Sequence, residues 1–432
     1  MFKTITKIIG RSLPIFLLLI FASAVLMGQK NIDIGTDSYE FTNGNWFDGK
    51  RFVQKTMYSM GGFFSEKKPV NTDHSVDLSG GYVVPPFGDA HNHTVEMSYN
   101  IDAFTKVLYT EGIFYLKNPN SVPRFTKSLS GKISDAKTLD VTFANGGLTA
   151  SGGHPSVLYD TVLANGPFKF TKIKSYNSLA YHLIDNEEDL SNKWSRIIAD
   201  SPDFIKIYLL FSEEFAERRD KDVNGYKGLD PDLVPIIVKR AHDAGLRVSA
   251  HINTAHDFKV AVNAGVDELS HLPGRFSQLV GDFERYILDE KDVIRAACNN
   301  ITVIPTYSLF ESRPKKDAEP DKKAQDVQKA NLGLLRKHNV KIAFGPDSYN
   351  STSKKEALYI KNLGVFSNLE LLTMWSVNTP LTIFPKRKIA RLADGYEASF
   401  LVLEQNPIED FEAVSMISYR FKQGFPIDVS GK

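Results

Sequence analysis

Residues 82–93 of the chain read YVVPPFGDAHNH. The apolar run Tyr82–Phe87 is typical of a buried strand, and His91 and His93 follow it directly. Side chains two residues apart on an extended segment point to the same side, so the two imidazoles can bind one divalent metal ion. The pair alone is weak evidence, since two surface histidines in a loop are the more common arrangement. Its position after an apolar strand favours a metal site.

Four more residues with metal-binding side chains end or interrupt other strand-like runs, namely Lys206, His251, His271 and Asp347. A barrel of parallel strands brings the strand ends to one face, where ligands far apart in sequence can meet. Each residue also has a plainer interpretation. The two histidines could be hydrogen-bonded core residues, and Asp347 could cap the helix or turn that starts at Ser348. Their shared position at strand ends favours a metal-dependent hydrolase.

Lys206 lies within the almost wholly apolar segment DFIKIYLL, residues 203–210. A protonated lysine is costly to bury without a partner, and desolvation and nearby metal ions favour the neutral amine. That amine can take up carbon dioxide to form a carbamate, which is able to bridge two metal ions. The alternative is a lysine paired with Asp203 or Asp347, and Lys206 taken alone favours that alternative.

The middle of the chain alternates strand-like and helix-like runs, as βα units do. Segments 232–245 and 255–265 have apolar residues at helical spacing and end in glycine, a typical stop signal. The pattern predicts an α/β fold with a (β/α)8 TIM barrel at residues 86–380. The eight strands expected are Tyr82–Phe87, Ile113–Leu116, Leu139–Phe143, Phe204–Leu209, Arg247–Ala250, Val266–Leu269, Thr302–Pro305 and Lys341–Phe344.

Short strands and tight turns at both ends of the chain predict a second, smaller domain. Residues 39–52, YEFTNGNWFDGKRF, alternate apolar and polar side chains and are broken by Asn-Gly and Asp-Gly turns. Residues 398–403, ASFLVL, form another expected strand, and the dipeptide at 406–407 marks a turn. We therefore expect a small β-sandwich domain built from residues 29–85 and 381–432, with the barrel between them.

The first 28 residues are predicted to be a signal peptide. Lys3, Lys7 and Arg11 precede an apolar run, Leu13–Met27. That run is shorter than the ~20 residues that a membrane-spanning helix usually needs. We expect export to the periplasm, with no stable membrane partner after signal cleavage. An uncleaved membrane anchor is the alternative, and cleavage near residue 24 or near residue 28 stays open.

The composition limits the functional classes. The chain has 432 residues, of which 42% are hydrophobic and 24% charged, as in an ordinary globular protein. A formal net charge of +1 offers no electrostatic support for a nucleic-acid partner. Cys298 is the only cysteine, which excludes an intramolecular disulfide and a thiolate zinc cluster. Because it lies in a helix-like segment without an evident partner, we interpret Cys298 as a core residue.

The order His-X-His, Lys, His, His, Asp at strand ends resembles the amidohydrolase superfamily. The resemblance is greatest to the group of imidazolonepropionase-like proteins and metal-dependent Xaa-Pro dipeptidases, which are prolidase-like amidohydrolases. It covers about Tyr39 to Asp410, nearly the whole chain after the signal segment. Similar local stretches are DFIKI at 203–207, SGGH at 151–154, SVNTP at 376–380 and LEQNPIED at 403–410.

The resemblance implies a binuclear site, usually loaded with zinc. By this resemblance one metal ion is held by His91, His93 and Asp347, the other by His251 and His271, and a carboxylated Lys206 bridges them. Carbon dioxide would supply the carboxylate of that lysine. The lysine argues against the mononuclear, deaminase-like members and against imidazolonepropionase itself, which lacks it.

Two segments depart from the family pattern. The usual Ala-Asp-Leu near the C-terminus is replaced by Ala398-Ser399-Phe400, in the expected β domain and away from the chemistry. Residues 116–121 read LKNPNS where the family commonly has an Arg-Asp-Leu-Gly type of segment. That change is expected to reshape the substrate pocket, so a substrate is not transferred with the fold.

Three further residues are second-rank candidates. His154 lies in a glycine-rich loop and could bind a substrate carbonyl or carboxylate, or could serve only the loop structure. Tyr208 lies two residues after Lys206 and so on the same side of the strand. It could donate a hydrogen bond to a tetrahedral intermediate, with core packing as the alternative. Arg275 could bind a substrate carboxylate.

The predicted function is that of an exported hydrolase with two divalent metal ions, zinc being favoured. It would cleave a non-aromatic C–N amide bond in a small-molecule substrate, a dipeptide or an N-acyl amino acid. The expected mechanism is attack by a metal-bridging hydroxide with Asp347 as proton shuttle and His154 and Tyr208 as catalytic residues. Alternatives are a lactonase, esterase or phosphoesterase on the same metals, or an inactive exported binding protein. A homo-oligomer is also open.

Overall fold

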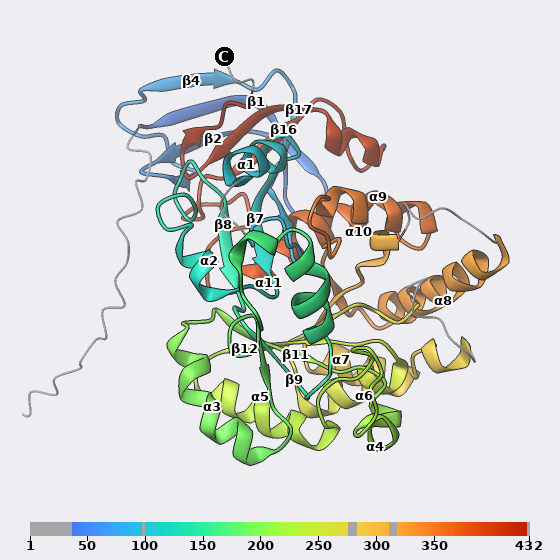
Figure 1. The fold of residues 1–432 in the computed structure, drawn as a ribbon. Coiled ribbons are helices and arrows are strands. Elements are labelled where there is room, and N and C mark those ends of the chain that lie inside the picture. The colour runs from blue at the N-terminus through green and yellow to red at the C-terminus, as the bar shows by residue number, and fades with distance from the viewer. Residues whose placement is uncertain (1–36, 97–99, 275–282, 311–317, 430–432) are drawn as a thin grey trace, which may run out of the picture. The chain divides into compact units, whose positions relative to one another are not determined.

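The computed structural model describes residues 37–96, 100–274, 283–310 and 318–429 (Figure 1). The predicted signal peptide, residues 1–28, lies outside the described residues, and so does Arg275. Export and signal cleavage therefore stay predictions.

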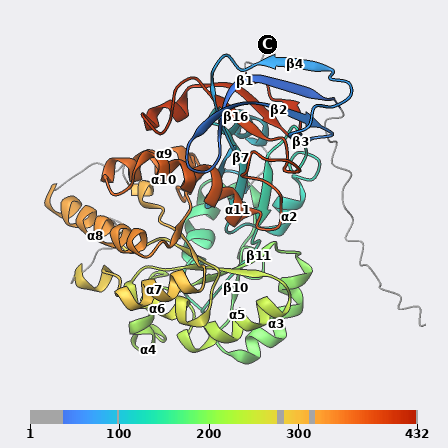
Figure 2. The same cartoon turned by 180° about the vertical axis from the view of Figure 1, so that it is seen from behind.

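Strands from both ends of the described chain pair in one sheet, which is seen from behind in Figure 2. Among the described residues this sheet has eight strands, in the order β18-β17-β16-β5-β1-β2-β3, with β4 paired to β1. The strand β5 joins the two ends, because it pairs with β1 on one side and with β16 on the other. The strands are β1 (Tyr39–Phe47), β2 (Phe52–Met60), β3 (Phe63–Ser65), β4 (His74–Asp77), β5 (Tyr82–Val84), β16 (Phe400–Leu403), β17 (Ile417–Lys422) and β18 (Phe425–Pro426).

Parallel strands make up the middle of the chain, which confirms the predicted α/β class. In the described residues they form a seven-stranded sheet, ordered β10-β9-β11-β12-β13-β14-β15, and a three-stranded sheet, β6-β7-β8. Their bounds are β6 (Phe87–Asp89), β7 (Ile113–Asn118), β8 (Asp140–Phe143), β9 (Gly147–Thr149), β10 (Tyr181–Leu183), β11 (Phe204–Tyr208), β12 (Arg247–His251), β13 (Glu268–Ser270), β14 (Thr302–Ile304) and β15 (Lys341–Ile342).

Backbone hydrogen bonds link the two parallel sheets at two places. The Ala90 amide, just after β6, donates to the Phe344 carbonyl beyond β15 at 2.8 Å. The Asp203 amide, just before β11, donates to the Phe143 carbonyl at the end of β8, also at 2.8 Å. The last parallel strand therefore lies next to the first.

Helices alternate with the parallel strands, and in Figure 1 the helices α3 to α7 surround β11 and β12 in the lower part of the view. The two helices expected from sequence are confirmed as α5 and α6. A capping box of Thr254 and Asp257 begins α6, and Gly265 ends it with a left-handed φ of 79°. The helices are α1 (Ile101–Thr110), α2 (Pro123–Lys127), α3 (Glu187–Ala199), α4 (Phe215–Arg218), α5 (Val234–Asp243), α6 (Ala255–Ala264), α7 (Glu290–Cys298), α8 (Ala318–Lys337), α9 (Ser353–Leu363), α10 (Asn368–Thr373) and α11 (Thr379–Ile383). Within the described residues, none is both long and apolar enough to cross a membrane.

The first expected barrel strand, Tyr82–Phe87, is wrong in its extent. Residues 82–84 form β5 of the eight-stranded sheet, whereas the parallel sheet starts only at Phe87 with β6. Pro85 and Pro86 separate the two strands. A proline has no amide proton to donate to a strand ladder, so the apolar run could not continue as one strand. The short strands β9 and β10 were also not expected.

Cys298 is not a core residue, contrary to the expectation from sequence. It is the last residue of α7, and its side chain is exposed. The core-facing stripe of this helix carries Val293 and Ala296. With 3.6 residues per turn, a residue five positions after Val293 points well away from that stripe.

Candidate metal site and cavity

All eight of the residues proposed from sequence as ligands or catalytic groups line one cavity. The cavity has a volume of about 780 Å³. The eight residues are His91, His93, His154, Lys206, Tyr208, His251, His271 and Asp347. They come from six separate places along the chain, so only the tertiary structure brings them together.

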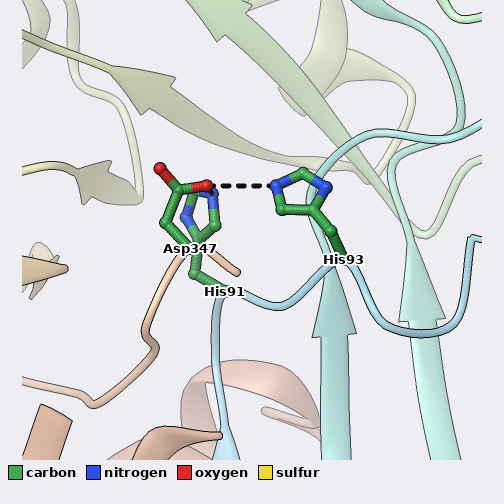
Figure 3. A group of neighbouring side chains, drawn as sticks. All are labelled: His91, His93 and Asp347. Atoms are coloured by element: carbon green, nitrogen blue, oxygen red, sulfur yellow. Dashed lines mark hydrogen bonds and ion pairs between the residues drawn. The ribbon is translucent and has the colours of Figure 1, made fainter. Parts of the chain in front are cut away.

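His91, His93 and Asp347 form the tightest group in the cavity (Figure 3). Asp347 Oδ1 lies 3.2 Å from Nε2 of His91 and 3.1 Å from Nε2 of His93. One potential ligand atom from each residue lies within 4.8 Å of the others. Two imidazole nitrogens and a carboxylate oxygen converging in this way are a ligand set that suits zinc.

The backbone holds the two segments of this group side by side. The Asp347 amide donates to the His91 carbonyl, and the His93 amide donates to the Ser348 carbonyl, both at 2.9 Å. Gly345 allows this approach, since a Cβ there would lie only 2.4 Å from the His91 nitrogen. Asp347 has a left-handed φ of 55°, which a non-glycine residue adopts at a cost and often at functional sites.

His251 and His271 form a second group next to the first. Their ring centroids are 4.2 Å apart, and the His271 ring is 4.6 Å from that of His91. The Nδ1 atom of His271 lies 2.8 Å from the Thr306 hydroxyl oxygen and 3.6 Å from Oδ2 of Asp347. Asp347 therefore lies between the two groups, as a shared ligand or a proton carrier would.

Lys206 and Tyr208 enter the cavity from the same side of β11. The register pairs Lys206 with Ser249 and Tyr208 with His251 on β12. Lys206 is 1% exposed, and its Nζ lies 5.6 Å from the centre of the Tyr208 ring. Asp203, three residues earlier, accepts a hydrogen bond from the Phe143 amide at 2.8 Å. An odd spacing along a strand puts Asp203 and Lys206 on opposite faces, which disfavours their pairing.

Two of the three residues of the first group, His91 and Asp347, have the protonation state of a metal ligand, whereas His93 would release a proton on binding a metal ion. Burial, aided by the charge of Lys206, lowers the pKa of His91 to about 3 despite the nearby Asp347. Burial also opposes the charged form of His93, but hydrogen bonds to Asp347 and Glu96 outweigh it and raise its pKa to about 9. Burial opposes ionisation of Asp347 as well, yet His271 and His91 hold its pKa well below the usual range. Asp347 is thus a carboxylate and His91 a neutral imidazole, the forms that bind metal.

His154 lies beside Tyr208 and His251 at the cavity. Its ring centroid is 5.2 Å from that of Tyr208 and 4.9 Å from that of His251. The His154 amide donates to the Lys227 carbonyl at 2.9 Å, which ties its glycine-rich loop to a second loop. Both His154 and Tyr208 are therefore positioned to reach a substrate, although packing alone also explains the burial of Tyr208.

Several cavity residues were not expected from the sequence. Asn120 belongs to the segment that departs from the family pattern, and it lines the cavity together with Tyr159 and Tyr349. Glu96 lies directly behind His93, with its Oε1 2.5 Å from Nδ1 of that histidine. The three-residue spacing between His93 and Glu96 was a usable signal, because a chain that turns after His93 brings the two side chains together.

Similarity to known proteins agrees with this site. No family model matches the chain. The curated ochratoxinase of Aspergillus niger is 27% identical over 213 residues, which are 48% of this chain and 43% of that protein. The match thus spans less than half the length of this relative. The crystal structure of A. niger ochratoxinase superposes with a TM-score of 0.70 at 16% identity, covering 90% of this chain and 95% of that one.

The crystal structure of a Xaa-Pro dipeptidase with methionine bound in its active site is similar as well. It superposes with a TM-score of 0.68 at 18% identity, over 91% of this chain and 100% of the other. The expected resemblance to amidohydrolases is confirmed at the level of the fold. At these identities the likeness of the structures establishes the fold alone. The activity of this chain has to be argued from its own residues.

Proposed function

We propose that this amidohydrolase-like chain is an exported, binuclear metal-dependent hydrolase. Its reaction would be cleavage of a non-aromatic C–N amide bond in a dipeptide or an N-acyl amino acid. The observation that carries the proposal is the gathering of six ligand-type side chains on one cavity, with Asp347 within 3.6 Å of three of the histidines.

The donor set divides into two halves around Asp347. His91, His93 and Asp347 would hold one divalent ion, and His251 and His271 would hold the other. When bound, the two ions would lower the pKa of a water molecule and polarise the substrate carbonyl. Zinc suits imidazole and carboxylate ligands best, although manganese, iron and cobalt are also accepted by such ligands.

Lys206 would complete the site after reaction with carbon dioxide. The neutral amine forms an N–C bond to carbon dioxide and loses one proton, which leaves a carbamate with two oxygen donors. The 1% exposure of Lys206 supports this step, because burial disfavours the ammonium form. The strand that bears it, β11, pairs with β12, which bears His251, and Lys206 lines the same cavity as His91 and His93, which suits a bridging ligand.

Asp347 is the residue best placed to move the proton of the reaction. It is ionised, it lies between the two histidine groups, and its side chain is 18% exposed. It would accept a proton from the attacking water and pass it to the leaving amine. Tyr208 or His154 would donate a hydrogen bond to the developing oxyanion from the other side of the cavity.

The cavity walls suit a small amide with an apolar side chain. Apolar and aromatic residues line much of it, including Val157, Leu158, Val162, Leu210 and Leu309. A volume of about 780 Å³ is within the range of small-molecule sites. The A. niger relative, named ochratoxinase, and the Xaa-Pro dipeptidase support a hydrolase of C–N bonds.

We also propose that the two parallel sheets form the (β/α)8 barrel. Its support is the pair of backbone hydrogen bonds between the two sheets and the placement of the candidate ligands at strand ends. The domain boundaries, the β-sandwich and export to the periplasm belong to the same proposal. Export would be tested by finding the N-terminus of the mature protein in a periplasmic fraction.

Metal analysis of the purified protein tests the proposal first. Wild type grown with zinc should hold nearly two ions per chain, and Lys206→Ala should hold fewer. A panel of dipeptides, N-acyl amino acids, lactones and phosphoesters would then test the reaction. Turnover of lactones or phosphoesters alone would refute the amide assignment, and full metal loading without any turnover would point to a binding protein.

A further inference from the structure

Glu96 is a buried carboxylate that the proposed mechanism does not use. It is 1% exposed and lies three residues after His93. Its backbone amide donates to the His93 carbonyl at 3.2 Å, so the chain turns back on itself here. The turn brings the Glu96 side chain behind the imidazole, on the side away from Asp347.

The His93 ring is held between two carboxylates. Its Nε2 lies 3.1 Å from Oδ1 of Asp347, whereas its Nδ1 lies 2.5 Å from Oε1 of Glu96. If Nε2 binds a metal ion, the proton of the ring is on Nδ1 and is donated to Glu96. A metal-binding histidine commonly donates its second ring N–H to such an acceptor, which sets the tautomer and the ring orientation.

Two tyrosines hold Glu96 in turn. The Tyr159 hydroxyl lies 3.2 Å from both carboxylate oxygens, and the Tyr349 hydroxyl donates to Oε1 at 3.4 Å. Tyr159 comes from the π-helix Leu158–Leu163, and Tyr349 follows Asp347 by two residues. The Tyr349 ring also stacks on the His93 ring, with centroids 5.0 Å apart.

We propose that Glu96 is the positioning residue for His93, and that Tyr159 and Tyr349 fix its carboxylate. This assignment rests on the proposed function, because it requires His93 to be a metal ligand. The two tyrosines also line the cavity. The same three side chains would therefore connect the substrate wall with one ligand of the metal site.

Zinc competition with a chelator tests this role on the full-length protein. Glu96→Ala should lower zinc affinity by about 10- to 100-fold, the usual cost of losing such a partner. Glu96→Gln should lose less, since its amide oxygen still accepts from Nδ1. In the cobalt(II)-loaded protein, the visible spectrum should change in Glu96→Ala and return toward wild type in Glu96→Gln. A purely structural role would not order the variants in this way.

Glu290→Gln is the matched control. Glu290 also pairs with a histidine, with 2.7 Å between its Oε1 and Nε2 of His338, but on the surface. The zinc affinity of the Glu290→Gln protein should equal that of wild type. If Glu96→Ala does not fold, the double variant Tyr159→Phe/Tyr349→Phe replaces it in the same experiment. Its expected loss of zinc affinity is smaller.

Wild-type zinc affinity in the Glu96 variants, or in the double variant when it replaces them, would overturn the positioning role and leave the proposed function intact. A wild-type protein that binds no zinc would overturn both. The two failures are therefore distinguishable.

Discussion

Two buried polar regions of this chain differ in how their charges are compensated. In the cavity, imidazoles and the Asp347 carboxylate face a shared space of about 780 Å³. In the second region, which we call the ion cluster, Glu268 is 1% exposed and is paired with Lys117 and Arg247. Thr382 also donates to Glu268. In the ion cluster the carboxylate is thus compensated by two cations and a hydroxyl, whereas in the cavity several potential ligand atoms face one shared volume.

The difference shows what each region is built for. A buried carboxylate surrounded by cations and a hydroxyl has its hydrogen-bonding needs met within the protein and contributes to the fold. A group of imidazole and carboxylate side chains at ligand spacing is fully compensated only when a metal cation binds and displaces any ring proton. Substitutions in the cavity should therefore change metal binding and turnover, whereas substitutions in the ion cluster should change stability.

The largest expected effect is that of Asp347→Asn on turnover. The amide cannot take up the proton of the attacking water, so kcat should fall by about 10²- to 10⁴-fold, the usual contribution of a general base. Some metal should remain bound through the histidines. The measurement is steady-state kinetics beside metal analysis. Unchanged kcat would remove Asp347 from the proton transfer.

Glu268→Gln should cause the largest loss of folding stability. It leaves the buried Lys117 beside a neutral group and takes one carboxylate partner from the partly exposed Arg247. Breaking a buried ion pair typically costs about 3–5 kcal/mol. Denaturant unfolding measures the effect. The exposed pair of Glu290 and Lys337 is the control, and Glu290→Gln should cost no more than ~1 kcal/mol. A large loss of zinc in folded Glu268→Gln would contradict the separation of the two regions.

Acid should weaken the ion cluster over a defined range of pH. Burial raises the pKa of Glu268, but Lys117 and Arg247 outweigh it and lower the value from 4.5 to about 2. A pKa that is lower in the folded state stabilises the protein above the unfolded value. That contribution is present above pH 4.5 and is lost as the pH falls toward 2. Glu268→Gln should lack this part of the pH dependence of unfolding, and an identical slope in both proteins would refute it.

The smallest effect is expected for Cys298→Ala. The side chain is exposed at the end of α7, and surface substitutions usually change stability by no more than ~0.5 kcal/mol. Thermal unfolding and metal content should both match wild type. Destabilisation of several kcal/mol would restore the core interpretation of this cysteine.

The positions of the candidate ligands at strand ends were predictable because each is a local pattern. A histidine, lysine or aspartate at the end of an apolar run is visible in a few residues, as at His251 or Asp347. The parallel order of strands then implies one face. By contrast, the sheet to which Tyr82–Val84 belongs depends on partners more than 300 residues away in sequence, at Phe400–Leu403.

The side chains that hold the candidate ligands in place were less predictable. Glu96 lies near His93 in the chain, but the hydroxyls that hold it come from Tyr159 and Tyr349, on two distant segments. The exposure of Cys298 likewise depended on which face of α7 packs inward. Side-chain contacts of this kind follow from packing, and a single sequence does not reveal them.

By itself, the sequence determined the alternation of strands and helices, the ligand types and their order along the chain. These are short-range properties, set by hydrophobic spacing and by the chemistry of single side chains. Only the tertiary structure decided that the eight residues share one cavity, that β5 leaves the parallel strands, and that Glu96 lies behind His93. Those facts depend on which surfaces pack against each other, and packing joins residues that are remote in the chain.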